Sequence, residues 1–66
     1  MKLWVNGAPA EINGLTNVAD LAEHYALQPN TVLIEHNQTA LHPREWVARK
    51  LGEGDRIEFI RVVAGG

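Results

Sequence analysis

The first residues alternate between the two faces of a strand and then turn sharply. Residues 2–6 alternate around two apolar positions and end in Asn6-Gly7. This pair is typical of a tight hairpin because both residues tolerate a positive φ. Residues 8–12 are therefore expected to return as the second strand. Pro9 places that strand at an edge of the sheet, since proline cannot donate a ladder hydrogen bond.

A single amphipathic helix follows this hairpin. Apolar residues recur at the i, i+3, i+4 and i+7 positions from Val18 to Tyr25, which predicts one buried helix face. Thr16 and Asn17 both suit the N-cap position, where a side-chain oxygen accepts a hydrogen bond from the first turn. Pro29 prevents the helix from continuing. The prediction is a helix of about two to three turns.

The second half of the chain predicts three further strands. Residues 31–36 are rich in β-branched side chains, residues 39–41 form a short partner, and residues 56–63 form the longest strand. A brief helical piece is expected over residues 47–51, followed by a turn over residues 52–55. A hairpin, one crossing helix and a final strand beside the first predict an α+β fold of the β-grasp type. Its mixed sheet has four to five strands packed on one main helix.

Composition limits the classes of function open to the chain. With 66 residues, 45% of them hydrophobic and 21% charged, the chain is expected to form one globular domain. A formal net charge of -2 gives no electrostatic argument for binding nucleic acid or a membrane surface. Nothing near the N-terminus resembles a signal peptide, so a cytoplasmic protein is expected. We interpret residues 1–62 as the globular part and residues 63–66 as a flexible tail.

Several side chains that could carry chemistry have simpler interpretations. The sequence has no cysteine, which excludes disulfides, thiolate metal sites and a cysteine nucleophile. His24, His36 and His42 match no familiar metal-ligand spacing and are interpreted as exposed surface histidines. Trp4 and Trp46 are expected to be buried or half-buried anchors. No catalytic, metal or cofactor site is predicted within this chain.

Basic side chains gather at one place in the sequence. Arg44, Arg49 and Lys50 form the only basic cluster. We interpret this cluster as a solvated face or an enzyme contact, in preference to an RNA site.

The final residues are the strongest functional signal. The sequence closes on Gly65-Gly66, and glycines without a Cβ make a thin, bending segment that can enter a narrow channel. Val63, Ala64 and Gly65 are therefore predicted to thread the active sites of partner enzymes. The α-carboxylate of Gly66 is predicted to be the reacting group, an anion at neutral pH with an ordinary pKa of about 3.3–3.7. The alternative is a frayed end with no function.

The last strand predicts a docking surface beside this tail. If Ile57 faces the helix, the period of two places Glu58, Ile60 and Val62 on the opposite face. Two apolar side chains on a solvent-facing surface suggest a patch for a partner protein. Arg61 could pair with an acidic partner or remain solvated. A reversed register, or exposed apolar residues without any role, are the alternatives.

Several short motifs follow one another in a fixed order along the chain. They are Lys2-Leu3-Trp4-Val5-Asn6-Gly7, Leu15-Thr16, Asn37, Pro43-Arg44-Glu45-Trp46, Gly54-Asp55-Arg56-Ile57-Glu58 and Val63-Ala64-Gly65-Gly66. Together these motifs resemble those of the thiamine-biosynthesis sulfur carrier (ThiS) family, which has a ubiquitin-like fold. Two departures concern local turns: Asn17 is one extra residue before the helical face, and Gln38 stands where a glycine is common.

The resemblance implies a carrier that other enzymes act upon, and not an enzyme. A ThiF-type, E1-like adenylyltransferase would use Mg-ATP to adenylylate the Gly66 carboxylate. Sulfur from a cysteine desulfurase or another persulfide donor would then displace AMP and leave a thiocarboxylate. A ThiG-type thiazole synthase would take that sulfur for the thiazole ring of thiamine. No cofactor would be bound by the carrier itself.

Other functions remain open at this point. The same thiocarboxylate could supply sulfur for tRNA thiolation or for molybdopterin. An activated Gly66 could instead acylate lysines of target proteins, as in a ubiquitin-like modifier. A non-covalent β-grasp interaction module is the third class, in which the two glycines are incidental.

Overall fold

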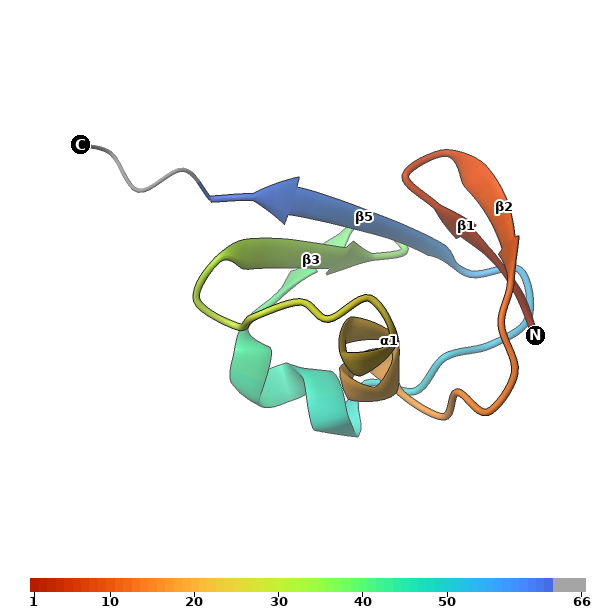
Figure 1. The fold of residues 1–66 in the computed structure, drawn as a ribbon, viewed down its shortest axis with the longest axis horizontal. Helices are drawn as coiled ribbons and strands as arrows, with labels where there is room; N and C mark the ends of the chain where they lie inside the picture. The colour runs from red at the N-terminus through yellow and green to blue at the C-terminus, as the bar shows by residue number, and fades with distance from the viewer. Residues whose placement is uncertain (63–66) are drawn as a thin grey trace.

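The computed structural model describes residues 1–62, which form a five-stranded mixed sheet with helical elements on one side (Figure 1). Strands follow the order β2-β1-β5-β3-β4, in which β1 and β5 are parallel and the other neighbours antiparallel. This is the β-grasp arrangement that the sequence predicts. The elements are β1 (Lys2–Val5), β2 (Ala8–Glu11), α1 (Val18–His24), β3 (Val32–His36), β4 (Thr39–Leu41), the 3-10 helix η1 (Pro43–Ala48) and β5 (Arg56–Arg61).

Both hairpins turn through two residues in the left-handed region. Asn6 and Gly7 have φ values of 50° and 83°, and Asn37 and Gln38 have values of 48° and 72°. Two successive positive φ values match the twist of the flanking strands, which is why Asn-Gly is favoured in such turns. As predicted, Pro9 lies on an edge strand, since β2 is outermost in the sheet.

The start of α1 is fixed by a capping box. The Asn17 side chain accepts a hydrogen bond from the Asp20 amide at 2.9 Å, and the Asp20 carboxylate accepts from the Asn17 amide at 3.3 Å. This reciprocal pair satisfies backbone donors that have no partner within the helix. The prediction that Tyr25 belongs to the buried helix face is wrong, because α1 ends at His24 and Tyr25 is 37% exposed. Its ring instead contacts Phe59 edge to face, at 5.2 Å between centroids.

The core lies between the two helical elements, α1 and η1, and the face of the sheet that they cover (Figure 1). Both helical elements cover the same face, while no described element covers the other (Figure 1). Within residues 1–62, no helix is long and apolar enough to cross a membrane. The fully buried large side chains are Leu3, Val18, Leu21, Ile34 and Ile57.

The second helical element differs from the prediction. A helical piece was expected over residues 47–51, but η1 spans Pro43–Ala48. It begins earlier because Pro43 suits a first helical position and the Glu45 carboxylate accepts the His42 amide at 2.7 Å. This early start buries Trp46 in the core, while Trp4 is half-buried on the opposite face. Both tryptophans are thus the anchors that the sequence predicts.

Candidate docking site at the C-terminal end of β5

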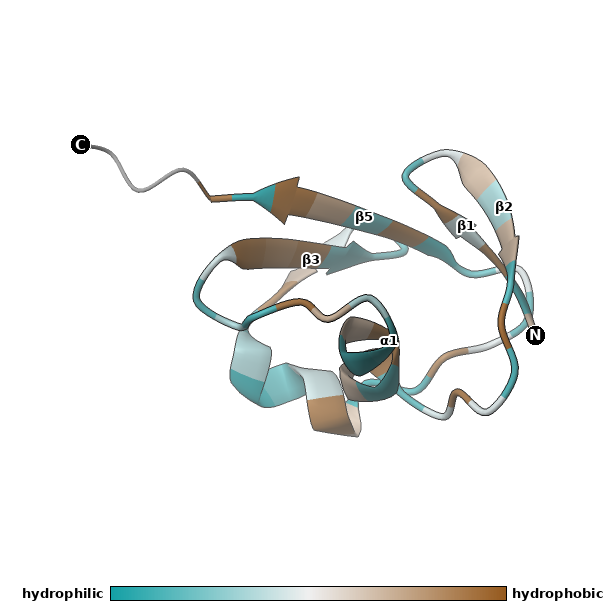
Figure 2. Cartoon of the chain, viewed as in Figure 1, coloured by the Kyte–Doolittle hydropathy of each residue, from teal (hydrophilic) through white to brown (hydrophobic). Residues whose placement is uncertain are grey.

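The side chains of β5 become exposed toward its C-terminal end. Ile57 is fully buried and Phe59 half-buried, both on the face covered by α1. Ile60 and Val62, by contrast, are 45% and 57% exposed. The alternation of buried and exposed side chains agrees with the register that the sequence predicts. In Figure 2 hydrophobic and hydrophilic colours alternate along β5 as far as its C-terminal end.

A neighbouring strand extends this apolar surface. Leu33 of β3 lies directly opposite Ile60 in the antiparallel ladder, so both side chains stand on the uncovered face. The Val62 amide donates to the Thr31 carbonyl at 3.0 Å, which keeps the chain beside β3 past the end of the strand. We call Leu33, Ile60 and Val62 the open-face patch. Sequence analysis missed Leu33, although the inward alternation of Val32 and Ile34 could have placed it.

Charged side chains border the open-face patch on one side. Glu58 lies opposite Glu35 of β3, so two carboxylates share the uncovered face next to the Leu33–Ile60 pair. Arg61 does not join them: it pairs with the buried Val32 and therefore belongs to the other face. Of the four predicted docking residues, the structure brings Glu58, Ile60 and Val62 together and separates Arg61.

One aromatic and two basic side chains cluster on the uncovered face near the start of β5. The Lys2 ammonium lies 5.1 Å from the centroid of the Trp4 ring, and the Arg56 guanidinium lies 5.5 Å from it. Cations at this distance interact favourably with the electron-rich face of an indole. The uncovered face is thus basic near the start of β5, acidic in the middle and apolar at the end.

One side chain forms a hydrogen bond with the β5 backbone where the neighbouring strand β1 has ended. The strand β1 pairs with β5 only as far as Ile57. Beyond that point the Asn6 side chain accepts a hydrogen bond from the Phe59 amide at 2.8 Å. The turn residue Asn6 therefore continues the pairing by one step after β1 has ended.

The structure does not describe the residues that are predicted to react and to thread partner active sites. Val63, Ala64, Gly65 and Gly66 lie outside the described residues. Their roles as tail and modification site stay predictions. The open-face patch is the surface nearest to them in the chain.

The prediction that all three histidines are exposed is wrong for His36, which is 5% exposed. Its Nε2 lies 2.7 Å from the Asp55 carboxylate, and its Nδ1 accepts a hydrogen bond from the Arg49 Nε at 2.8 Å. An arginine Nε–H can only donate, so Nδ1 carries a lone pair and Nε2 carries the proton. The inward alternation of Val32 and Ile34 extends to His36 and would have revealed its burial.

Asp55 is the centre of a polar cluster at the start of β5. Burial alone would raise the pKa of this carboxyl group. Hydrogen bonds from His36, the Gly52 amide and the Asn37 side chain stabilise the carboxylate more strongly, and the pKa of Asp55 is lowered as a result. The cluster joins β3, the Asn37 turn and the turn before β5.

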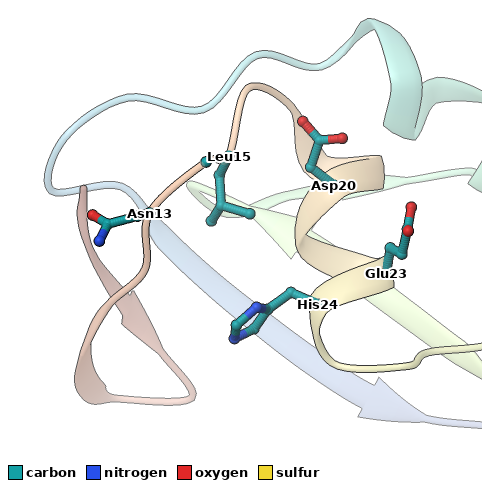
Figure 3. Close-up of a pocket in the computed structure, with 6 residues that line it drawn as sticks. Asn13, Leu15, Asp20, Glu23 and His24 are labelled. Atoms are coloured by element: carbon teal, nitrogen blue, oxygen red, sulfur yellow. The ribbon is translucent and has the colours of Figure 1, made fainter.

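A second polar region is a shallow hollow of about 320 Å³ beside α1 (Figure 3). The ring of His24 extends toward Asn13 and Leu15, while Asp20 and Glu23 project from the helix (Figure 3). The Asp20 carboxylate already accepts hydrogen bonds from the backbone amides of Thr16 and the N-cap residue Asn17. Among residues 1–62, no group of three or more His, Cys, Asp or Glu side chains could hold a metal ion. The carboxylate of Asp20 at this hollow therefore caps the start of α1.

Comparison with known proteins gives a consistent picture. The model of the ThiS family matches residues 3–66. A crystal structure of the thiamine biosynthesis protein ThiS from Geobacter metallireducens is 32% identical, with full coverage of both chains and a TM-score of 0.85. A solution structure of a Geobacter metallireducens thiamine biosynthesis protein is also 32% identical. It has a TM-score of 0.81 and covers all of this chain and 88% of its own.

A more distant relative shows how far the sequence pattern extends. An uncharacterised protein, ycf40, from Trieres chinensis is 22% identical over 63 residues, which are 96% of this chain and 86% of that protein. The family model includes both the β-grasp strands and the terminal Gly65-Gly66. This chain belongs to the ThiS family.

Proposed function

We propose that this chain is a sulfur carrier for thiazole formation in thiamine biosynthesis, and a substrate of other enzymes, not a catalyst. The observation that carries the proposal is the family match over residues 3–66, which includes the terminal glycines. The similar structures from Geobacter metallireducens are those of thiamine biosynthesis proteins. We further propose that the carrier acts in the cytoplasm.

The proposed chemistry converts a poor acyl donor into a reactive one. The Gly66 carboxylate attacks the α-phosphorus of Mg-ATP on a ThiF-type adenylyltransferase, and pyrophosphate leaves. The terminal sulfur of a cysteine-derived persulfide attacks the acyl carbon, and AMP leaves. A thiol then reduces the resulting sulfur–sulfur bond and releases the thiocarboxylate. A ThiG-type thiazole synthase is the proposed acceptor of this sulfur.

Docking of the partners is assigned to the open-face patch. Leu33, Ile60 and Val62 form an apolar surface that no described element covers, and Val62 is the residue immediately before the tail. A partner that binds there would hold the tail close to its active site, which lowers the entropic cost of threading it. Glu58, next to the patch, would select partners that present a basic side chain. Arg61 could contact an acidic side chain only around the edge of the sheet.

The first experiment is intact mass spectrometry. The protein is incubated with a ThiF-type enzyme, ATP and a sulfur donor, and a second sample lacks Gly66. We expect a mass rise equal to the replacement of one oxygen by sulfur, in the full chain only. An unchanged mass, with an enzyme shown to be active on another carrier, would overturn the proposal and favour a non-covalent interaction module.

The second experiment tests docking separately from chemistry. Ile60→Asp places a charge in the open-face patch, and Val47→Asp makes the same change at an apolar residue of η1 that is 68% exposed. We expect Ile60→Asp to slow pyrophosphate release about tenfold or more, as for a central interface residue. Val47→Asp should stay close to the wild type. Equal rates for all three folded proteins would remove the docking role of the patch.

A further inference from the structure

A second hollow lies between β4 and η1, on the helix-covered side of the sheet and therefore not on the face of the open-face patch. Its volume is about 450 Å³. Apolar atoms of the buried Leu41 form part of its wall, together with charged side chains of η1 and the residue after it. The residues that line it are Leu41, Arg44, Glu45, Ala48 and Arg49.

The charges in this hollow are not balanced. Within residues 1–62, neither Arg44 nor Arg49 makes an ion pair with a carboxylate. The Glu45 carboxylate accepts the His42 amide at 2.7 Å and so is held at the start of η1. Two guanidinium groups against one carboxylate leave a single net positive charge in the hollow.

The Arg49 side chain is fixed by a hydrogen bond to the buried His36. Its Nε donates to His36 Nδ1 at 2.8 Å, the only side-chain hydrogen bond that Arg49 makes within residues 1–62. Asp55 accepts a hydrogen bond from the protonated Nε2 of His36 and thereby fixes the tautomer that Arg49 requires. The two terminal nitrogens of the guanidinium keep their donors for another acceptor. A side chain fixed before binding loses less conformational entropy when it binds.

We propose that this hollow is a second interaction surface, which binds an acidic side chain of a partner protein. Arg44 and Arg49 bind the carboxylate, and His36 is a positioning residue that acts through Arg49. Planar guanidinium groups match the two oxygens of a carboxylate. The apolar wall at Leu41 accepts the methylene groups of an Asp or Glu side chain. One net positive charge suits a singly charged carboxylate better than a phosphate.

The direct test is an NMR titration with an acetylated, amidated tri-glutamate peptide at low ionic strength. We expect shifts of the Arg44 and Arg49 Nε–H signals and of the Leu41 and Ala48 amides, which added salt weakens. Arg44→Ala and Arg49→Ala should each reduce affinity roughly three- to fivefold, the range for partly exposed ion pairs. The matched control Arg56→Ala removes the same charge from the opposite face and should leave affinity unchanged.

Two results of this titration would overturn the proposal. One is equal affinity for the wild type and the Arg49→Ala variant. The other is tighter binding of inorganic phosphate than of the peptide, which would reassign the hollow to phosphoanions. Arg44 is exposed and Arg49 only half-buried, so both variants are expected to fold.

The positioning role of His36 has its own readout. His36→Gln offers an oxygen to Arg49 and an N–H group to Asp55, whereas His36→Leu offers neither. We expect slow solvent exchange of the Arg49 Nε–H in the wild type and the Gln variant, and fast exchange with weaker peptide binding in the Leu variant. Unchanged exchange in a folded Leu variant would show that His36 does not position Arg49.

Discussion

The two ends of β5 differ in how firmly the fold holds them. At the start, the Asp55 carbonyl accepts the Trp4 amide at 2.9 Å, the Arg56 carbonyl accepts the Asn37 amide at 2.8 Å, and Ile57 is fully buried. At the other end, Val62 keeps one backbone bond to Thr31 and its side chain is exposed. One strand thus anchors the core at its start and presents an exposed apolar surface at its end.

This difference arises from the neighbours of β5. Ile57, Phe59 and Arg61 share one face, yet they are buried, half-buried and exposed in that order. The side chains lose cover because β1 pairs only as far as Ile57 and α1 ends at His24. Alternation in a strand determines the face of each residue, and adjacent elements determine its burial.

The largest predicted effect compares the same substitution at the two ends. Ile57→Ala leaves a cavity in the closed core and should lower the free energy of unfolding by about 2–5 kcal/mol. Ile60→Ala removes an exposed side chain and should change it by about 0.5 kcal/mol or less. Urea denaturation of both variants measures this contrast. Equal losses at the two positions would show that Ile60 is part of the core.

The next prediction concerns the polar cluster at the anchored end. The Asp55 carboxylate accepts hydrogen bonds from His36, Gly52 and the Asn37 side chain. Asp55→Asn replaces one acceptor oxygen with a donor, so at least one of these N–H groups loses its partner. We expect a loss of about 1.5–3 kcal/mol, as for hydrogen bonds to a charged group. Chemical denaturation at neutral pH measures it.

The same Asp55→Asn variant measures how much Asp55 contributes to stability in acid. The pKa of Asp55 is lowered in the folded protein, so folding favours the carboxylate form. This contribution is therefore present above the ordinary pKa of 3.8 and is lost as the pH falls through the lower folded value. Asp55→Asn should make the free energy of unfolding less dependent on pH in acid. An unchanged acid slope would contradict the lowered pKa.

Patterns among residues close in sequence were sufficient to predict the β-grasp architecture. The Asn6-Gly7 turn, the Asn17 cap and the alternation of β5 each depend on residues close in sequence, and all three are present. The exposed side of Ile60 and Val62 followed from the same alternation. The roles of Gly66 and of the tail were predicted from the two glycines and from the family resemblance, and residues 63–66 lie outside the described part of the chain.

Contacts between distant segments could not be predicted in this way. His36 meets Asp55, 19 residues later in the chain, and Arg49, 13 residues later, and neither separation has a periodic signature. The partners of His36 therefore could not be predicted, although the alternation of β3 places its side chain on the buried face. The helical piece was placed too late because the capping role of Glu45 was not considered.

A smaller effect is predicted where β5 passes from the anchored to the exposed end. Asn6→Gly keeps the positive φ of the turn but removes the acceptor of the Phe59 amide. We expect a loss of about 1 kcal/mol and faster hydrogen exchange at Phe59. The control Asn6→Asp keeps an oxygen in place and should protect that amide. Slow exchange in both variants would show that Asn6 does not close this edge.

The smallest effect is a gain at the Asn37-Gln38 turn, which adjoins the anchored end through the Asn37–Asp55 hydrogen bond. Gln38 has a φ of 72°, which strains a residue with a Cβ. Gln38→Gly relieves this strain at some cost in unfolded-chain entropy, so we expect a net stabilisation of about 0.5 kcal/mol. For a domain of this size the melting temperature should rise by about 2–4 °C.

A control variant and hydrogen exchange test whether the Asn37-Gln38 turn supports the start of β5. Gln38→Ala removes the long side chain but keeps the Cβ, so it should give no stabilisation. If the turn supports the anchored end, Gln38→Gly should slow hydrogen exchange at Ile57 and leave the Val62 amide unchanged. Equal slowing at both amides would mean that β5 opens as one unit. The exposed end would then be as firmly held as the buried one, despite its missing neighbours.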